Sequence, residues 1–306
     1  MRIRNILLTS AAVLLSAASI PASATLSMHT WVSGTGNDAN TGARNSPYAD
    51  FATAVANTAA GGIVSVVDPG DYGPVTILQS ITIDGGNMGS IGFTGGEGIY
   101  IDPASGGTVV LRGLTVDGEG VGTDAIFFSG VGNLTIDNCK LEGFTQIGVG
   151  VGSTGIENVV VKNTTIVGGT LGVRTFQSSG LVPYDSVSLD HVTIQGATSA
   201  GVFSRNGSME ISNSVITQNN GAGTVGVQAD TSANISVESS MITLNTTAVC
   251  VYSSAKIRLE NVDIFDNGTG VAACGGQIKT NGSNRDSGNT NGNPGVPSEV
   301  TATVVF

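Results

Sequence analysis

The sequence predicts an all-β fold, a right-handed parallel β-helix with three sheets and a short N-terminal capping helix. An apolar pattern recurs along the chain at gaps of 22 to 33 residues. Each unit contains three short segments of alternating apolar and polar residues, separated by turn-forming glycine, asparagine and serine. No helical period lies between these segments. Such a repeat is typical of a solenoid, in which one coil cannot bury its apolar face alone.

Three columns of apolar residues define the predicted coil. The first column contains Leu78, Leu111, Ile136, Val161, Leu189, Ile211, Val237 and Leu259. The second, five residues later, contains Ile83, Val116, Leu141, Ile166, Ile194, Ile216, Ile242 and Ile264. The third follows a small residue and contains Ile99, Ile126, Val149, Val173, Val202, Val227, Val249 and Val271. We expect each column to form one buried stack.

Two polar columns follow the first apolar column. Two residues after it stand Ser80, Gly113, Asn138, Asn163, His191, Asn213, Ser239 and Asn261, for which we expect a turn with stacked, hydrogen-bonded amides. One residue after it, opposite charges alternate in Arg112, Asp137, Lys162 and Asp190. Stacked strands lie about 4.8 Å apart, so these charges are expected to touch between neighbouring coils.

The N-terminal segment has the pattern of a signal peptide. Arg2 and Arg4 precede an apolar run from Ile6 to Ile20, and Ala22-Ser23-Ala24 is a small-x-small cleavage site. We expect residues 1–24 to be removed on export and residues 25–306 to form a single domain. The predicted location is secreted, periplasmic or at the surface of a bacterium, with no transmembrane segment after cleavage.

The ends of the domain are expected to be covered. Ser46-Pro47, Phe51, Val55 and Gly61-Gly62 predict a capping helix at about 47–60. The coils are then expected at about 63–290. The tail, 291–306, alternates in Val300, Ala302, Val304 and Phe306, and is expected to pair along the side of the solenoid or to cover the last coil.

Composition limits the partners and cofactors. The net charge of −11 argues against nucleic acid or an anionic membrane. No spacing resembles a metal-binding motif, so we expect no cofactor; a calcium ion is not indicated either.

The three cysteines are predicted to remain unpaired. Cys139 is expected to point inward as a small apolar filler. Cys250 and Cys274 are expected to face outward on adjacent coils, in diagonal positions with α-carbons about 8 Å apart, which is too far for a disulfide.

The chain resembles a family of exported bacterial right-handed β-helix repeat proteins. The asparagine turn is similar to that of the pectate-lyase-like superfamily. The opening, from WVSGTGNDANTG to ITIDG, and the end, GGQIKTNGSNRDSGNTNG, resemble the family's first and closing coils. The opening in that family often carries two cysteines where this chain has Gly42 and Tyr48. The resemblance implies a fold and export but no reaction.

A candidate ligand-binding groove lies on the outward face of the sheet that contains the third column. Its residues are Tyr100, Phe127, Arg174, Phe176, Phe203, Arg205, Gln228, Asp230 and Tyr252. The loop Gln177–Ser186 leaves the same sheet. Aromatic rings stack on sugars and arginines pair with carboxylates, which indicates a polysaccharide groove. The alternative is a surface ladder in which Arg205 pairs with Asp230 and the phenylalanines pack on turns.

No catalytic set is evident. A calcium-dependent lyase needs converging carboxylates and a glycosidase needs two at a defined separation, and the groove offers neither. Glu238 and Glu260 are like-charged neighbours on the second sheet, where Arg258 and Lys279 can neutralise them. We therefore expect a non-catalytic module that binds carbohydrate or a surface partner such as a cell-surface glycan. The alternatives are a polysaccharide lyase or glycoside hydrolase acting in the groove, and a passive structural envelope protein.

Overall fold

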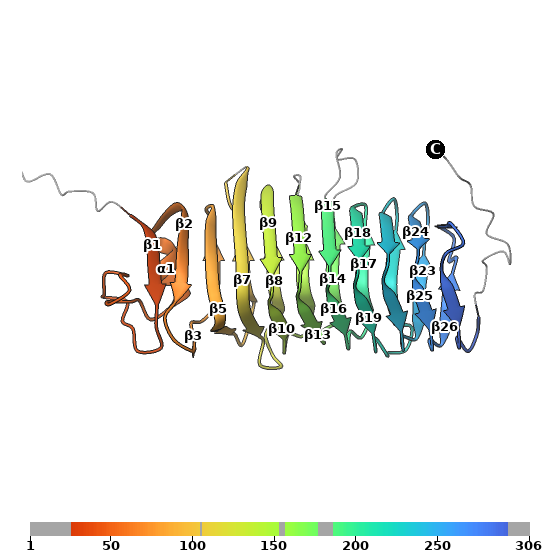
Figure 1. The fold of residues 1–306 in the computed structure, drawn as a ribbon, viewed down its shortest axis with the longest axis horizontal. Helices are drawn as coiled ribbons and strands as arrows, with labels where there is room; N and C mark the ends of the chain where they lie inside the picture. The colour runs from red at the N-terminus through yellow and green to blue at the C-terminus, as the bar shows by residue number, and fades with distance from the viewer. Residues whose placement is uncertain (1–25, 105, 153–156, 177–185, 293–306) are drawn as a thin grey trace, which may run out of the picture.

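The chain forms a long solenoid of parallel strands. The computed structural model describes residues 26–104, 106–152, 157–176 and 186–292. Within these residues the coils succeed one another along a single axis, from β1 at one end to β26 and its neighbours at the other (Figure 1). The predicted all-β parallel β-helix is confirmed.

One face of every coil belongs to a sheet of nine strands. Each strand is short and pairs in parallel with its equivalents in the coils before and after. The strands are β4 (Val75–Ile77), β6 (Glu97–Ile101), β8 (Asp124–Phe128), β11 (Ile147–Val151), β14 (Leu171–Phe176), β17 (Ala200–Arg205), β20 (Val225–Asp230), β23 (Thr247–Val251) and β26 (Thr269–Ala272).

The other two faces form one sheet of nineteen strands that bends around a corner. Before the corner lie β1 (Ser27–Val32), β2 (Thr58–Val66), β9 (Gly132–Asp137), β12 (Glu157–Lys162), β15 (Ser186–Asp190), β18 (Ser208–Ser212), β21 (Asn234–Glu238), β24 (Lys256–Glu260) and β27 (Gln277–Thr280). After it lie β3 (Gly70–Asp71), β10 (Lys140–Glu142), β13 (Thr165–Val167), β16 (Thr193–Gln195), β19 (Val215–Thr217), β22 (Met241–Thr243), β25 (Asp263–Phe265) and β28 (Arg285–Ser287). Two long strands, β5 (Ile81–Gly92) and β7 (Gly107–Asp117), run through the corner.

The interior consists of the three predicted apolar columns. In the first column Ile136, Val161 and Leu189 are α-carbon partners across β9, β12 and β15, and each is fully buried. The stack continues through Ile211 and Val237. The second and third columns pair in the same way. The predicted register is therefore confirmed from Leu111 onward.

The register predicted for the coil before Leu111 is wrong. Leu78 was placed in the first column, but its side chain is 61% exposed, and Ile83 is the true partner of Leu111. Ile91, rather than Ile83, belongs to the second column, as the partner of Val116. The physical reason is a bulge in β5 between Asp84 and Gly89, which lengthens the spacing between the two inward positions.

The N-terminal helix is shorter than predicted and lies inside the first coil. The helix α1 spans Phe51–Ala56, instead of about 47–60, because Asp50 is its N-cap and accepts a hydrogen bond from the Thr53 amide at 2.6 Å. Gly61 and Gly62, expected to end the helix, lie within β2. The solenoid also begins before residue 63, since β1 pairs in parallel with β2. The helix packs on β1, β2 and β4, so it lies beside the first strand of the nine-strand sheet.

The polar column at the corner adopts the left-handed backbone conformation. Its members with positive φ are Gly113, Asn138, Asn163, His191, Asn213, Ser239 and Asn261. Asparagine tolerates this conformation better than most residues. The expected side-chain hydrogen bonds form in part rather than as a continuous ladder: Asn138 donates to Asn87 Oδ1 at 2.8 Å and Asn261 to Ser239 Oγ at 3.3 Å. Asn163 and Asn213 donate instead to an acidic residue of the previous coil, Asp137 at 2.9 Å and Asp190 at 2.8 Å. These bonds lower the pKa of both carboxyls.

The alternating charges beside the corner touch in part: within the predicted column only Lys162 and Asp137 form an ion pair, and Arg112 pairs with a residue outside it. Arg112 pairs with Asp84 at 2.8 Å and Lys162 pairs with Asp137 at 3.3 Å, each with a neighbouring coil.

An asparagine ladder does exist, but at the opposite corner and inside the core. Asn219, Asn245 and Asn267 are all at least 98% buried. Each side-chain amide donates to the next asparagine's Oδ1, at 2.8, 3.1 and 3.0 Å, and the last acceptor is Asn289. The backbone amides donate to the same oxygens. Buried amides tolerate no lost partner, so this ladder holds the turn of each coil to the next.

The last coil replaces apolar interior residues by polar ones. Thr280 is the partner of Leu259, and Asp286 is the partner of Ile264. Asn284 and Asn289 donate to the Leu259 and Ile264 carbonyls, each at 3.0 Å. The apolar columns therefore end in hydrogen-bonding groups at this end of the solenoid, as a terminal coil requires. The predicted role of the tail lies outside the described residues, as do the signal peptide and the loop residues 177–185.

The prediction that Cys250 and Cys274 stay apart is wrong. They form a disulfide with α-carbons 6.0 Å apart, and Cys250, although in the predicted outward row, is buried. The predicted register itself holds, because Cys250 is the partner of Ala272. The strand β26 ends at that residue, however, and Gly275, with φ +110°, then bridges antiparallel to Tyr252. This turn brings Cys274 back over Cys250. Cys139 is buried and unpaired, as predicted.

Replacing Val161 by Asp is expected to prevent folding. Val161 is fully buried, and an unpaired carboxylate in an apolar interior costs several kcal/mol. The neighbouring Val160 is 38% exposed, so Val160→Asp is the matched control and should fold normally. Circular dichroism melting of both variants decides the matter; a cooperative transition for Val161→Asp near that of the wild type contradicts the register.

Thiol alkylation tests the disulfide. Under denaturing conditions without reductant, one cysteine of the purified protein, Cys139, is expected to react; after reduction all three should react. Intact-mass measurement counts the labels. Three labels without reductant contradict the bond.

Candidate functional site

The outer face of the nine-strand sheet brings the predicted site residues into register. Tyr100 is the partner of Phe127, Arg174 of Phe203, and Phe203 of Gln228. A second row, two residues further along, pairs Phe176 with Arg205 and Arg205 with Asp230. Tyr252, 38% exposed, lies at the end of this row beside the disulfide. The sheet therefore places the predicted residues side by side over successive coils.

Aromatic rings lie along the early coils of this face. The Tyr100 and Phe127 rings are stacked, with centroids 6.3 Å apart and planes inclined by 13°. Gly150 follows in the same row, and a Cβ there would lie 2.6 Å from Cδ2 of Phe127. The missing side chain thus leaves room for the Phe127 ring to extend over the next strand. The two stacked rings form an apolar strip parallel to the solenoid axis.

Two arginines surround one exposed phenylalanine further along. The Cζ atoms of Arg174 and Arg205 lie 5.1 and 5.3 Å from the centroid of the Phe176 ring. Phe176 is itself 37% exposed. Cation–π contacts of this kind are worth about 0.5–1 kcal/mol at exposed sites, enough to orient the guanidinium groups. We call Arg174, Phe176 and Arg205 the arginine clamp.

The ion pair between Arg205 and Asp230, which the surface-ladder alternative requires, does not form. The two residues are α-carbon partners, but Arg205 donates from Nε to Thr231 Oγ1 at 3.3 Å. Asp230 accepts from the Thr231 amide at 2.6 Å and from the Ser253 hydroxyl at 3.0 Å. No ion pair within the described residues includes Arg174 or Arg205. The clamp therefore keeps its capacity to bind an external carboxylate.

A buried carboxyl beside the clamp was not predicted from the sequence. Asp124, at the start of β8, is only 7% exposed, and its Oδ1 accepts the Ile147 amide at 3.0 Å. Glu97 is its α-carbon partner. Burial raises the pKa of Asp124, and the charge of Glu97 raises it further, while the Ile147 amide and Arg174 lower it. Asp124 belongs to the row of residues that begin the strands of this sheet. Nothing in the sequence singled out this row, because most of its other members, from Ile147 to Val225, are apolar.

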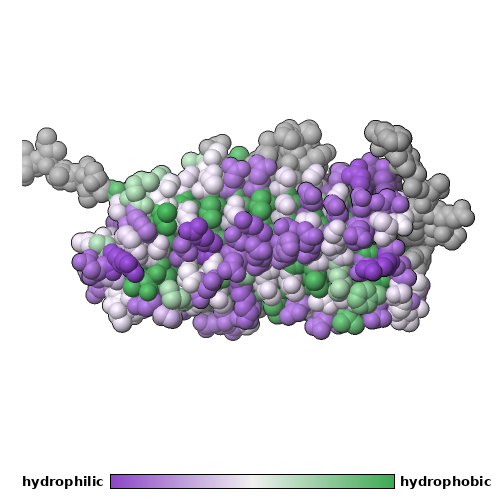
Figure 2. All heavy atoms as spheres, in the orientation of Figure 1, coloured by the Kyte–Doolittle hydropathy of each residue, from purple (hydrophilic) through white to green (hydrophobic). Residues whose placement is uncertain are grey.

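Neither a metal cluster nor a membrane helix is found within the described residues. No group of three or more His, Cys, Asp or Glu side chains is arranged to hold a metal ion there. No helix in that part of the chain is long and apolar enough to cross a membrane. Figure 2 shows that hydrophobic residues on the face in view occur in small groups between hydrophilic ones.

Asp124→Asn is expected to stabilise the protein more at pH 8 than at pH 4. The pKa of Asp124 is raised in the folded protein. Its contribution to folding stability is therefore fully present below the unfolded pKa of about 3.9 and is lost as the pH rises through the folded pKa. Asparagine retains the acceptor for the Ile147 amide but carries no charge. Melting temperatures at both pH values measure the difference; an equal shift at pH 4 and pH 8 contradicts the raised pKa.

Comparison with known proteins identifies the fold. The family model described as the right-handed β-helix region matches residues 182–296. The crystal structure of pectate lyase Pel9A has a TM-score of 0.58 at 13% identity, and the similarity covers 87% of this chain and 80% of that one. A rhamnogalacturonan lyase has a TM-score of 0.47 at 11% identity, covering 87% of this chain and 86% of that one.

An alginate lyase from Paenibacillus sp. strain FPU-7 has a TM-score of 0.44 at 13% identity, covering 79% of this chain and 95% of that one. No curated protein sequence matches the chain. At these identities the similarity establishes architecture alone. The chain is a right-handed parallel β-helix protein with a pectate-lyase-like fold.

Proposed function

We propose that this protein is a non-catalytic carbohydrate-binding module whose ligand lies on the outer face of the nine-strand sheet. The arginine clamp carries the proposal: two guanidinium groups meet at one exposed ring and neither forms an ion pair with a described residue. An aromatic face stacks on a sugar ring, and guanidinium groups pair with carboxylates. Together they favour a polysaccharide with acidic units.

The aromatic strip extends the proposed binding surface along the solenoid. Tyr100 and Phe127 lie on β6 and β8, and the clamp lies on β14 and β17. Since paired strands are about 4.8 Å apart, the strip and the clamp are separated by the width of only a few strands. An extended polymer can contact both, whereas a monosaccharide can contact only one. Phe203, Gln228, Asp230 and Tyr252 complete this surface toward the later coils.

Export is part of the proposal. The N-terminal 24 residues have the signal-peptide pattern, and a disulfide is typical of oxidising compartments such as the periplasm or the cell exterior. The mass of the exported protein, obtained in the alkylation experiment, also tests cleavage after Ala24. Pectate lyase Pel9A, which shares the fold, acts on a polysaccharide, as its name states.

A polysaccharide lyase or related enzyme is the second candidate. The observation that favours it is Asp124, a buried carboxyl with a raised pKa next to Glu97 and near Arg174. Ionisable groups with perturbed pKa values concentrate at functional sites. Asp124 is nevertheless almost inaccessible, and its carboxyl is already held by a backbone amide. Release of unsaturated or reducing sugar from a bound polymer, abolished by Asp124→Asn, distinguishes this candidate from simple binding.

Replacing Arg174 and Arg205 by alanine is expected to weaken binding of uronate oligosaccharides by roughly tenfold or more, because two charge-assisted contacts are lost. The melting temperature should change by less than about 4 °C, since only exposed cation–π contacts disappear. Isothermal titration calorimetry with a chelator present measures affinity, as the proposal requires no metal ion.

The matched control removes the same charge elsewhere. Arg112 and Lys162 are already paired with Asp84 and Asp137 at the corner, so their double alanine variant should bind as the wild type does. Equal affinity of the clamp variant and the wild type rejects the proposal.

A further inference from the structure

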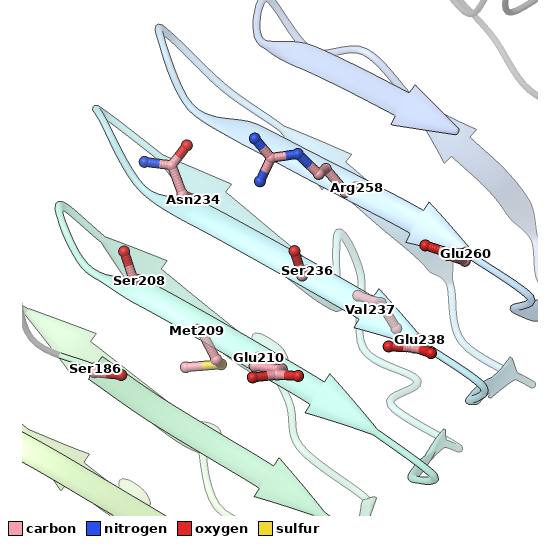
Figure 3. Close-up of a pocket in the computed structure, with 10 residues that line it drawn as sticks. All are labelled: Ser186, Ser208, Met209, Glu210, Asn234, Ser236, Val237, Glu238, Arg258 and Glu260. Atoms are coloured by element: carbon pink, nitrogen blue, oxygen red, sulfur yellow. The ribbon is translucent and has the colours of Figure 1, made fainter. Parts of the chain in front are cut away.

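A polar hollow lies on the outer surface of the nineteen-strand sheet, away from the arginine clamp. It has a volume of about 420 Å³ and spans β15, β18, β21 and β24. Figure 3 shows Ser236 on the strand between those that carry Glu210 and Arg258. These three are α-carbon partners in sequence, so a short side chain stands between two long ones. Short side chains, Ser186, Ser208 and Ser236, line the hollow.

Four charged side chains line this hollow, two lysines stand beside Arg258 on the same sheet, and these six form no ion pairs with one another. Three are carboxylates, on Glu210, Glu238 and Glu260, and three are cations, on Lys256, Arg258 and Lys279. The expectation that Arg258 and Lys279 neutralise Glu238 and Glu260 is not met, because none of the ion pairs within the described residues involves any of the six.

The charges at the corner of the same sheet behave differently. Arg112, Lys162 and Arg285 each pair with an aspartate of a neighbouring coil. The chain can therefore match charges between coils, and in the hollow it does not.

The two signs of charge occupy opposite corners of the patch. Lys256 and Arg258 stand at the first and third positions of β24, and Lys279 is the partner of Arg258 on the next coil. Glu238 and Glu260 are partners at the ends of β21 and β24. Along β24 the two cations precede the carboxylate of Glu260, while Glu210 and Glu238 lie on earlier coils and Lys279 lies on a later one.

Such a pattern is self-complementary. Consider two copies of the chain that face each other with this patch, related by a two-fold axis that lies in the contact plane. Each position on one copy then meets, on the other copy, the position on the opposite side of the axis. The axis must run along the line that separates the positive corner from the negative corner. It then places the three cations of one copy over the three carboxylates of the other. Both sets of contacts form at once, and the two solenoids cross.

We propose that this face is the interface of a homodimer, in which Lys256, Arg258 and Lys279 of each copy pair with Glu210, Glu238 and Glu260 of the other. The hollow over Ser236 accommodates long side chains of the opposite copy. The clamp lies on a different sheet, so a dimer presents two glycan-binding faces. The proposal does not depend on the proposed function.

The dimer is expected to be weak and sensitive to salt. The patch covers only a few strands, so a dimer would bury less surface than the usual 1,200–2,000 Å² of a stable interface. Exposed ion pairs also contribute little free energy each. The net charge of −11 opposes association at low salt, but at about 0.15 M salt the Debye length of about 8 Å screens that repulsion more than the contacting pairs. Association should be lost in about 1 M salt, where the Debye length is about 3 Å.

Analytical ultracentrifugation of the full mature protein tests the interface. The wild type is expected to shift from monomer to dimer as its concentration approaches the order of 1 mM in about 0.15 M salt. The double variant Arg258→Glu, Lys279→Glu and the double variant Glu238→Lys, Glu260→Lys should each remain monomeric. An equimolar mixture of the two should dimerise again, because each restores opposite charges for the other.

The control variant is Arg174→Ala, Arg205→Ala, which should lose glycan binding and keep dimerisation. All the side chains whose charge is reversed are exposed, so each variant should fold as the wild type does. A melting curve of each variant verifies this. A wild type that stays monomeric throughout the concentration series overturns the proposal. So does a mixture that fails to associate, or a single reversed variant that dimerises like the wild type.

Discussion

The structure depends on one constraint, the parallel in-register stacking of each inward side chain on its equivalent one coil away. Val161 contacts Ile136 on one side and Leu189 on the other, and no coil can shift without moving every apolar residue out of the core. The buried ladder through Asn219, Asn245 and Asn267 imposes the same register by hydrogen bonds, because each amide requires the next. Apolar packing and amide geometry thus specify one alignment.

The outer surfaces inherit this alignment without contributing to it. Alternation along a strand places the residues beside each inward column in outward rows, and stacking converts those positions into continuous stripes. The arginine clamp exists because Arg205 is held beside Phe176, as a consequence of Val202 stacking on Val173. The charged patch around Ser236 arises in the same way from the register of Ile211, Val237 and Leu259. A rigid interior leaves each face free to carry a different chemistry.

Sequence periodicity predicted the coils, the interior columns and the groove rows, since these follow from which residues face inward. It failed where backbone departs from the regular coil. The bulge in β5 displaced Leu78, and the turn at Gly275 brought Cys274 to Cys250. The buried asparagine ladder was missed because it lies in a turn outside the three apolar columns. Asp124 was missed because its burial depends on neighbouring coils. The role of the groove residues follows from chemistry that periodicity does not contain, so it stays a prediction.

The closing coil has a consequence for the whole molecule. Any parallel solenoid exposes, at its last turn, unpaired strand edges above an open apolar core, which invites another chain to continue the stack. Here Thr280 and Asp286 stand where a further coil would need aliphatic side chains, and Asn284 and Asn289 turn their amides back onto the preceding coil. A chain docking end to end would have to bury the carboxylate of Asp286. The last described turn is therefore a poor template for a further coil.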